Sequence, residues 1–152
     1  SEEKKARGIV ARMEQGDLCA LISAAGTPCI SDPGKTIVKK ALEAGVEVLA
    51  APGPSSVIAA LCISGVPSDK FLFYGFLPLK TGKRRTVLRT LGGMPYPVVF
   101  LESPLIMQNL LQVIHDELGS RFVVISKEMT KLHEEFISGT GTALLERIDT
   151  IK

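Results

Sequence analysis

The sequence predicts an α/β fold in which helices cover a parallel sheet. Along the first 64 residues, helix-like stretches alternate with short apolar runs of strand length, and such alternation is typical of a parallel sheet. A second α/β pattern follows after residue 68. We therefore expect an N-terminal α/β domain over residues 1–68 and a C-terminal α/β domain over residues 69–152.

The N-terminal domain begins with a predicted helix at 2–15. Charged residues alternate there with an apolar stripe, and Gly16 follows as a stop signal. The apolar runs 18–23 and 46–50 have the length and composition of buried parallel strands. We expect both runs to pair within one sheet.

Two more helices complete this half. Asp32-Pro33 places an N-cap residue before a first-turn proline, and Gly45 closes the helix that follows. A serine-capped apolar helix is expected at 56–64.

The C-terminal half shows the same kinds of signal, and Ser103-Pro104 again marks a helix start. Its expected strands are 71–76, 97–102, 121–130 and 134–140, and its expected helices are 80–91, 103–118 and 141–148.

Two rigid loops follow the predicted N-terminal strands. They are LISAAGTPCISDPG (21–34) and APGPSS (51–56). Because both follow parallel strands, they should meet at the carboxyl edge of the sheet, where open α/β folds bind ligands. Gly26 and Gly53 leave the backbone accessible. The loops do not match GxxxxGK[ST] or GxGxxG. Structural crossover turns remain the alternative interpretation.

A basic cluster begins the predicted helix at 80–91. Its members are Lys80, Lys83, Arg84, Arg85 and Arg89. Cations in the first turn of a helix oppose its dipole, and a phosphate partner would reverse that effect. The cluster is therefore a candidate RNA contact, with a solubilising surface as the alternative.

Composition narrows the classes of function. The net charge is +2, aromatic residues make up 5%, and the three cysteines form no CxxC pair. These values give no support to an aromatic platform for single strands, a metal site or a disulfide framework. No apolar run reaches the length of a membrane span. We expect a cytoplasmic protein.

Several stretches together resemble a known family. ISAAGTPCISDPG (22–34), PGPSSVIAAL (52–61), FLFYGFLP (71–78), FLESP (100–104) and KEMTKLHEE (127–135) are similar, in the same order, to stretches of the bacterial small-subunit ribosomal RNA 2′-O-ribose cytidine methyltransferases. That family belongs to the tetrapyrrole methylase superfamily. The resemblance implies two α/β domains with S-adenosylmethionine in the cleft between them, a homodimer, and ribosomal RNA or the small ribosomal subunit as partner.

The resemblance also implies site residues. The cofactor pocket would be lined by Ser23, Ala25, Gly26, Thr27, Pro52, Gly53, Pro54 and Ser55. Glu102 and the segment 128–134 would face the cleft from the second domain. Methyl transfer to a ribose hydroxyl requires a base, for which Glu128 and Glu134 are candidates, and Lys131 can stabilise the developing oxyanion. A solvated charged turn is the alternative for this segment.

Three positions depart from the family pattern. Ala24 replaces an aspartate, and Leu105 and Ile106 replace a histidine and an arginine. The family's first strand and its glycine-containing loop would precede Ser1, so we interpret the chain as a fragment. These departures keep two alternatives open. One is a non-catalytic homologue that binds S-adenosylmethionine or RNA, and the other is a small-molecule (tetrapyrrole) methyltransferase.

Overall fold

The computed structural model describes residues 2–147. It is a mixed α/β structure of two compact units, Ser1–Ser55 and Ser56–Lys152. The sequence places the boundary at residue 68, whereas in the structure the helix at 56–64 belongs to the second unit. Each unit is described by itself.

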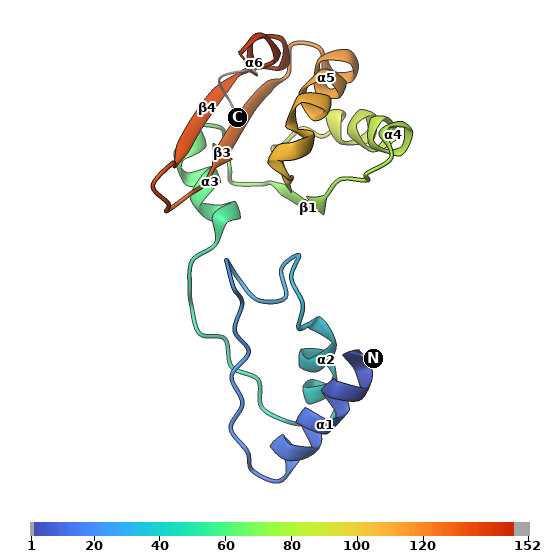
Figure 1. Ribbon diagram of the computed structural model, residues 1–152, viewed down its shortest axis with the longest axis vertical. Helices are drawn as coiled ribbons and strands as arrows, with labels where there is room; N and C mark the ends of the chain where they lie inside the picture. The colour runs from blue at the N-terminus through green and yellow to red at the C-terminus, as the bar shows by residue number, and fades with distance from the viewer. Residues whose placement is uncertain (1, 148–152) are drawn as a thin grey trace. The chain divides into compact units, whose positions relative to one another are not determined.

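Two helices form the packed part of the first unit. Helix α1 (Glu2–Glu14) lies against α2 (Lys35–Glu43), as Figure 1 shows. The buried side chains at this contact are small, namely Ala6, Val10 and Ala41. Both helices fall within their predicted ranges.

The predicted strands 18–23 and 46–50 do not form. Both segments run without regular secondary structure, and no described residue between 2 and 147 pairs with them in a ladder. Their apolar side chains are open to solvent, with Leu18, Ile22 and Leu49 exposed by 102%, 85% and 81%. A parallel strand exists only when a neighbour accepts and donates its backbone hydrogen bonds. The prediction of these two strands is therefore wrong for this chain.

The predicted cap of α2 is also wrong. Asp32 does not cap the helix. Its N-cap is Gly34, which has φ 117° and no side-chain cap. Cys29 and Ser31 also have positive φ, at 68° and 54°, so the chain keeps turning up to Gly34. A Cβ atom on Gly34 would lie 2.6 Å from Leu21 Cδ2, and the φ of 117° itself favours glycine at this position.

The second unit follows its predicted element order. Its elements are α3 (Ser56–Ser64), β1 (Leu72–Phe76), α4 (Thr81–Gly92), β2 (Val98–Leu101), the 3₁₀ turn η1 (Pro104–Ile106), α5 (Met107–Leu118), β3 (Phe122–Lys127), β4 (Glu135–Thr140) and α6 (Gly141–Glu146). Ser103 and Thr140 cap η1 and α6 by accepting backbone hydrogen bonds from Leu105 and Ala143. Residue 148 of the last predicted helix lies outside the described residues.

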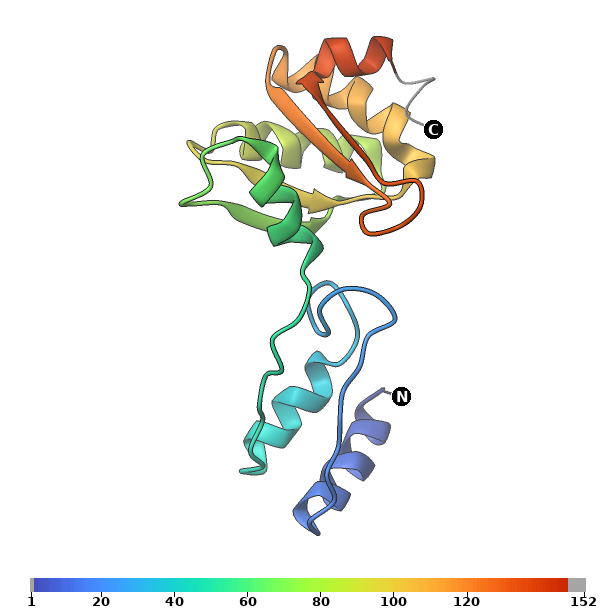
Figure 2. The same ribbon diagram turned by 90° about the vertical axis from the view of Figure 1, so that its left-hand side faces the viewer.

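The strands of this unit form two small sheets. Strands β1 and β2 are parallel, with Leu72 opposite Val98, and β3 and β4 are antiparallel. Parallel pairing sends the loops after β1 and β2 to the same edge. Figures 1 and 2 show β3 and β4 side by side, joined by a turn at one end of the pair.

Helix α5 carries the core of the second unit. Leu110, Val113 and Ile114 belong to a cluster with Leu88 on α4, while Leu111 belongs to a cluster formed with residues of β4 and α6. Leu111 has no exposed surface. One helix thus packs against both sheets through different residues.

Candidate functional site

A hydrogen bond joins the two rigid loops of the first unit. Thr27 Oγ1 donates to the Pro54 carbonyl oxygen at 3.0 Å. Within the first loop, Ser23 Oγ donates to the Ala25 carbonyl at 2.6 Å and accepts from the Ala25 N–H at 3.2 Å. The structure therefore brings the two predicted cofactor loops together, although the strands expected beneath them are absent.

The backbone of both loops is open. A Cβ atom on Gly26 would meet nothing within 4 Å, and one on Gly53 would meet only the Ala51 carbonyl oxygen at 3.9 Å. Gly26 has φ 70°, a conformation that side chains disfavour. Exposed N–H and C=O groups without side chains above them can approach a ligand closely. The backbone at Gly26 and Gly53 is therefore accessible.

The three predicted catalytic residues share the turn between β3 and β4. Lys131 Nζ lies 3.1 Å from Glu128 Oε2. Glu134 Oε2 accepts the Thr130 N–H at 2.6 Å, which stabilises the backbone of the turn. Glu128 and Thr130 have φ 49° and 67°, so the turn holds two side-chain-bearing residues in a left-handed conformation that costs energy.

Arg84 of the basic cluster is buried, which contradicts its prediction as an RNA contact. It is only 2% exposed. Its guanidinium donates to the Pro78 carbonyl at 3.0 Å and to Asn109 Oδ1 at 2.9 Å, and more weakly to the Leu79 carbonyl at 3.4 Å. These bonds fix the loop after β1 to α4 and α5, and they leave the side chain closed to a phosphate.

Arg85 and Arg89 are joined to acidic residues of α5. Arg85 lies 2.7 Å from Asp116 and 2.6 Å from Glu117. Arg89 forms an ion pair with Glu117, whose side chain is 6% exposed. This network joins α4 to α5. Its acids neutralise Arg85 and Arg89, two of the cations that were predicted to contact RNA. Lys80 and Lys83 are exposed, and no carboxylate within residues 2–147 pairs with either.

The network shifts the pKa values of its acids. The hydrogen bond from Arg89, followed by that from Arg85, holds the pKa of Glu117 below its usual value. The amide of Gln112, followed by Arg85, lowers the pKa of Asp116. The partners respond in the opposite sense, since Asp116 and then Glu117 raise the pKa of Arg85.

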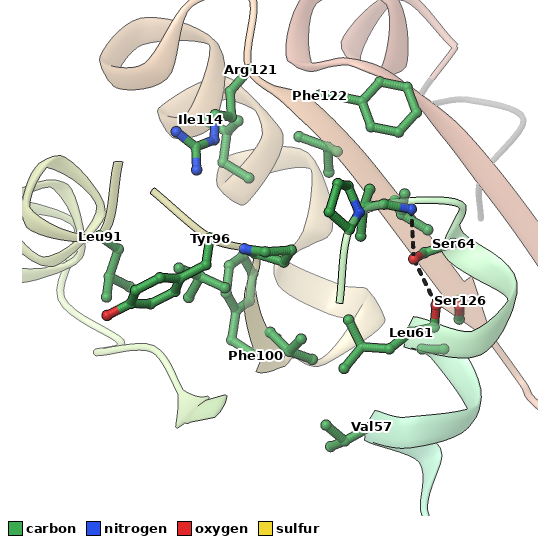
Figure 3. Close-up of a pocket in the computed structure, with 18 of the residues that line it drawn as sticks. Val57, Leu61, Ser64, Leu91, Tyr96, Phe100, Ile114, Arg121, Phe122 and Ser126 are labelled. Atoms are coloured by element: carbon green, nitrogen blue, oxygen red, sulfur yellow. Dashed lines mark hydrogen bonds between the residues drawn. The ribbon is translucent and has the colours of Figure 1, made fainter. Parts of the chain in front are cut away.

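An apolar cavity of about 960 Å³ lies in the second unit. In Figure 3, Tyr96 and Phe100 lie on one side of it, and Leu61 of α3 and Ser126 of β3 lie on the other. None of the predicted cofactor-binding, catalytic or RNA-binding residues lines this cavity. Sequence reasoning therefore missed the cavity, because its walls come from elements far apart along the chain.

Two buried polar atoms lack a hydrogen-bond partner in the part of the chain that the structure describes. They are Glu102 Oε1, directly after β2, and Ser126 Oγ, near the end of β3. The resemblance implied a place for Glu102 in the site, whereas nothing in the sequence marked Ser126. Between residues 2 and 147 no group of three or more His, Cys, Asp or Glu side chains can hold a metal ion. No helix in that range is long and apolar enough to cross a bilayer.

Comparison with known proteins identifies the family. The family model described as Tetrapyrrole (Corrin/Porphyrin) Methylases matches residues 1–145. The chain belongs to the tetrapyrrole methylase family. This membership confirms the superfamily that the sequence motifs indicated.

Curated relatives of this tetrapyrrole methylase share one name, "Ribosomal RNA small subunit methyltransferase I". The relative from Mesorhizobium japonicum is 45% identical over 91% of this chain and 47% of its own length. That from Escherichia coli O157:H7 is 42% identical over 88% of this chain and 47% of its own length. That from Thermotoga maritima is 40% identical over 100% of this chain and 68% of its own length. The chain thus spans about half the length of the first two relatives.

Proposed function

We propose that the protein containing this chain is an S-adenosylmethionine-dependent methyltransferase that modifies the 2′-oxygen of a cytidine ribose in small-subunit ribosomal RNA. The name shared by its relatives and its family membership support the reaction class. The observation that carries the assignment to this chain is the bond from Thr27 to Pro54, which joins the two loops that the family pattern assigns to the cofactor.

The loop surface fits the cofactor. The open space above Gly26 and Gly53 admits a flat ligand against the main chain, and backbone groups can read its polar edges. Ala24 offers no carboxylate, so the loops bind chiefly through backbone groups and the hydroxyl groups of their Ser and Thr side chains. When bound, S-adenosylmethionine supplies an electrophilic methyl group on a sulfonium.

The turn between β3 and β4 supplies the groups for the acceptor. Glu128 would take the proton of the ribose hydroxyl, while bound S-adenosylmethionine would supply the methyl group. Lys131, 3.1 Å from Glu128, stabilises the developing oxyanion. Glu134 holds the Thr130 N–H, so it acts as a positioning residue. Lys80 and Lys83 contact RNA phosphates.

Cofactor binding tests the role of the loops. In the full-length protein, Thr27→Val removes the bond to Pro54 and keeps the side-chain shape. We expect S-adenosylmethionine affinity, measured by calorimetry, to fall about tenfold, since a hydrogen bond is worth about 1 kcal/mol and the loop also loses preorganisation. Thr36→Val in α2 is the matched control and should leave affinity unchanged. Equal affinities for the two variants would contradict the assignment.

Methylation of ribosomal RNA tests the reaction. Mass spectrometry of small-subunit RNA from a strain lacking the gene should show the loss of one 2′-O-methylcytidine, which the intact gene restores. Glu128→Gln should lower kcat by about 10²- to 10⁴-fold with unchanged folding, the range expected for a lost base. An unaltered modification pattern in the deletion strain would remove the proposal.

A non-catalytic binding homologue is the second candidate. Leu105, which replaces a family histidine, is 95% exposed, and Ala24 lacks the family carboxylate. Cofactor binding without methylation by the full-length protein would support this candidate. The cleft between two domains, the homodimer and the cytoplasmic location stay predictions of the sequence.

A further inference from the structure

The aromatic residues of this chain are concentrated around one strand. The chain has two tyrosines and six phenylalanines, and four of these eight residues lie between positions 71 and 76, on β1 or directly before it. Among the residues that the structure describes, β1 pairs only with β2. The low aromatic content of the whole chain gave no support for a stacking surface, whereas this local concentration at the end strand of a sheet does.

Two of these rings are open to solvent. Tyr74 is 39% exposed and Phe76 is 58% exposed, while Gly75 between them is buried. Side chains alternate between the two faces of a strand, so Tyr74 and Phe76 share the outer face, about 7 Å apart along it. The pairing of β1 with β2 is irregular at Tyr74, and Gly75 has φ 83°. Irregularities of this kind re-aim side chains and often lie beside functional sites.

Two exposed lysines follow β1 closely. No carboxylate within residues 2–147 pairs with Lys80 or Lys83. Phe76 and Lys80 are four positions apart, so their Cα atoms lie within about 14 Å of each other even in an extended chain. Arg84 donates to the Pro78 carbonyl at 3.0 Å, which ties the short loop after β1 to α4 (Figure 1). The open rings and the unpaired charges therefore lie on neighbouring parts of one surface.

Exposed rings beside positive charge match the chemistry of an unpaired nucleic acid strand. Proteins bind such strands through aromatic rings on which bases stack and through cations that neutralise the phosphates. A duplex keeps its bases stacked on one another, so it cannot use the rings. A second copy of this chain fits the surface less well. A symmetric dimer brings identical patches together, and the lysines of the two copies would repel each other.

We infer that Tyr74 and Phe76 stack against unpaired bases of the substrate RNA, while Lys80 and Lys83 bind its phosphates. The surface holds a single-stranded segment without reading its sequence, because every base has a ring face on which to stack. This inference rests on the proposed function, because that function makes RNA the ligand.

Two oligonucleotides separate stacking from charge in the full-length protein. One is an unpaired oligocytidine, and the other is an abasic strand with the same number of phosphates. In fluorescence anisotropy titrations, wild type should prefer the strand with bases, and each ring should contribute about fivefold or more to that preference. Tyr74→Ala and Phe76→Ala should each lower the preference by that factor and leave the salt dependence unchanged. Replacing both lysines by Ala should make the salt dependence shallower for both strands and keep the preference.

Conservative variants show whether the rings act by stacking. Tyr74→Phe keeps the ring and should keep the preference. Phe76→Leu keeps an apolar side chain without a ring and should lose the contribution of Phe76. A matched control is Phe136→Ala, which removes a ring that is 40% exposed on β4 and should leave the preference unchanged.

Equal affinity of wild type for the two strands overturns the inference, even if RNA is methylated. A full preference in Phe76→Leu does the same, as does one that survives Tyr74→Ala and Phe76→Ala combined. If that double variant keeps the preference but sedimentation shows a dimer becoming a monomer, the face joins two copies and the inference is wrong. If the preference depends on the rings but small-subunit RNA is not methylated, the stacking surface stands and the proposed function fails.

Discussion

Replacing Arg84 should destabilise the fold rather than weaken RNA binding. The side chain is 2% exposed and donates to the Pro78 carbonyl at 3.0 Å and to Asn109 Oδ1 at 2.9 Å. Arg84→Met keeps much of the volume and removes every donor, so both acceptors lose their partner inside the protein. Hydrogen bonds from a charged donor contribute about 1.5–3 kcal/mol each. The two shorter bonds together predict a loss of about 3 kcal/mol or more.

Urea unfolding followed by circular dichroism measures this loss. With an m-value of about 2 kcal/mol/M, a change of about 3 kcal/mol lowers the midpoint by about 1.5 M. Lys83→Met is the matched control, since it makes the same chemical change one residue earlier at an exposed position. Its unfolding free energy should change by less than about 0.5 kcal/mol. A midpoint shift in Arg84→Met as small as that of the control would refute the structural role of the buried guanidinium.

Three further outcomes are expected. Gly34→Ala should lower the unfolding free energy by about 1–2 kcal/mol, measured by urea titration, because φ 117° and the approach of Leu21 disfavour a Cβ atom. The pKa of Glu117 is lowered in the folded protein, so its ion pairs stabilise the fold fully above the pKa of the unfolded chain, and this stability is lost as the pH falls through the folded pKa. Glu117→Gln should therefore flatten the acid limb of a curve of unfolding free energy against pH. A parallel shift of the whole curve would count against this. Replacing Lys80 and Lys83 together by Ala should make the log–log salt slope of RNA binding shallower by about 1.4, from about 0.7 per lost phosphate contact, while cofactor affinity stays the same.

The sequence predicted the second unit well because its signals are local. Ser103 caps the turn that follows it, as its place before Pro104 predicted, and the apolar runs at β1 to β4 lie close to their expected ranges. The segments at 18–23 and 46–50 have an equally clear strand pattern but form no strands. A strand needs a hydrogen-bonding neighbour, and the pattern within a segment does not show whether that neighbour is present.

The prediction for Arg84 of the basic cluster is wrong for a related reason. Five cations within ten residues resemble an RNA contact when they are read along the chain. The partners of Arg84 and Arg85 are Asn109, Asp116 and Glu117, which follow 25 to 32 residues later in the chain. Periodicity placed these residues on two helices but did not reveal that the helices face each other. The sequence predicted that the two cofactor loops lie close together. It did not show that Thr27 donates a hydrogen bond to the Pro54 carbonyl between them.

The double role of α5 has a consequence for how the second unit opens. Met107 and Val123 pack against both apolar clusters, so separating either sheet from α5 also disturbs the other. Amide protons of the parallel pair and of the hairpin should therefore exchange with deuterium at similar rates, as members of a single cooperative unit. A protease should not release the hairpin alone while the remainder stays protected.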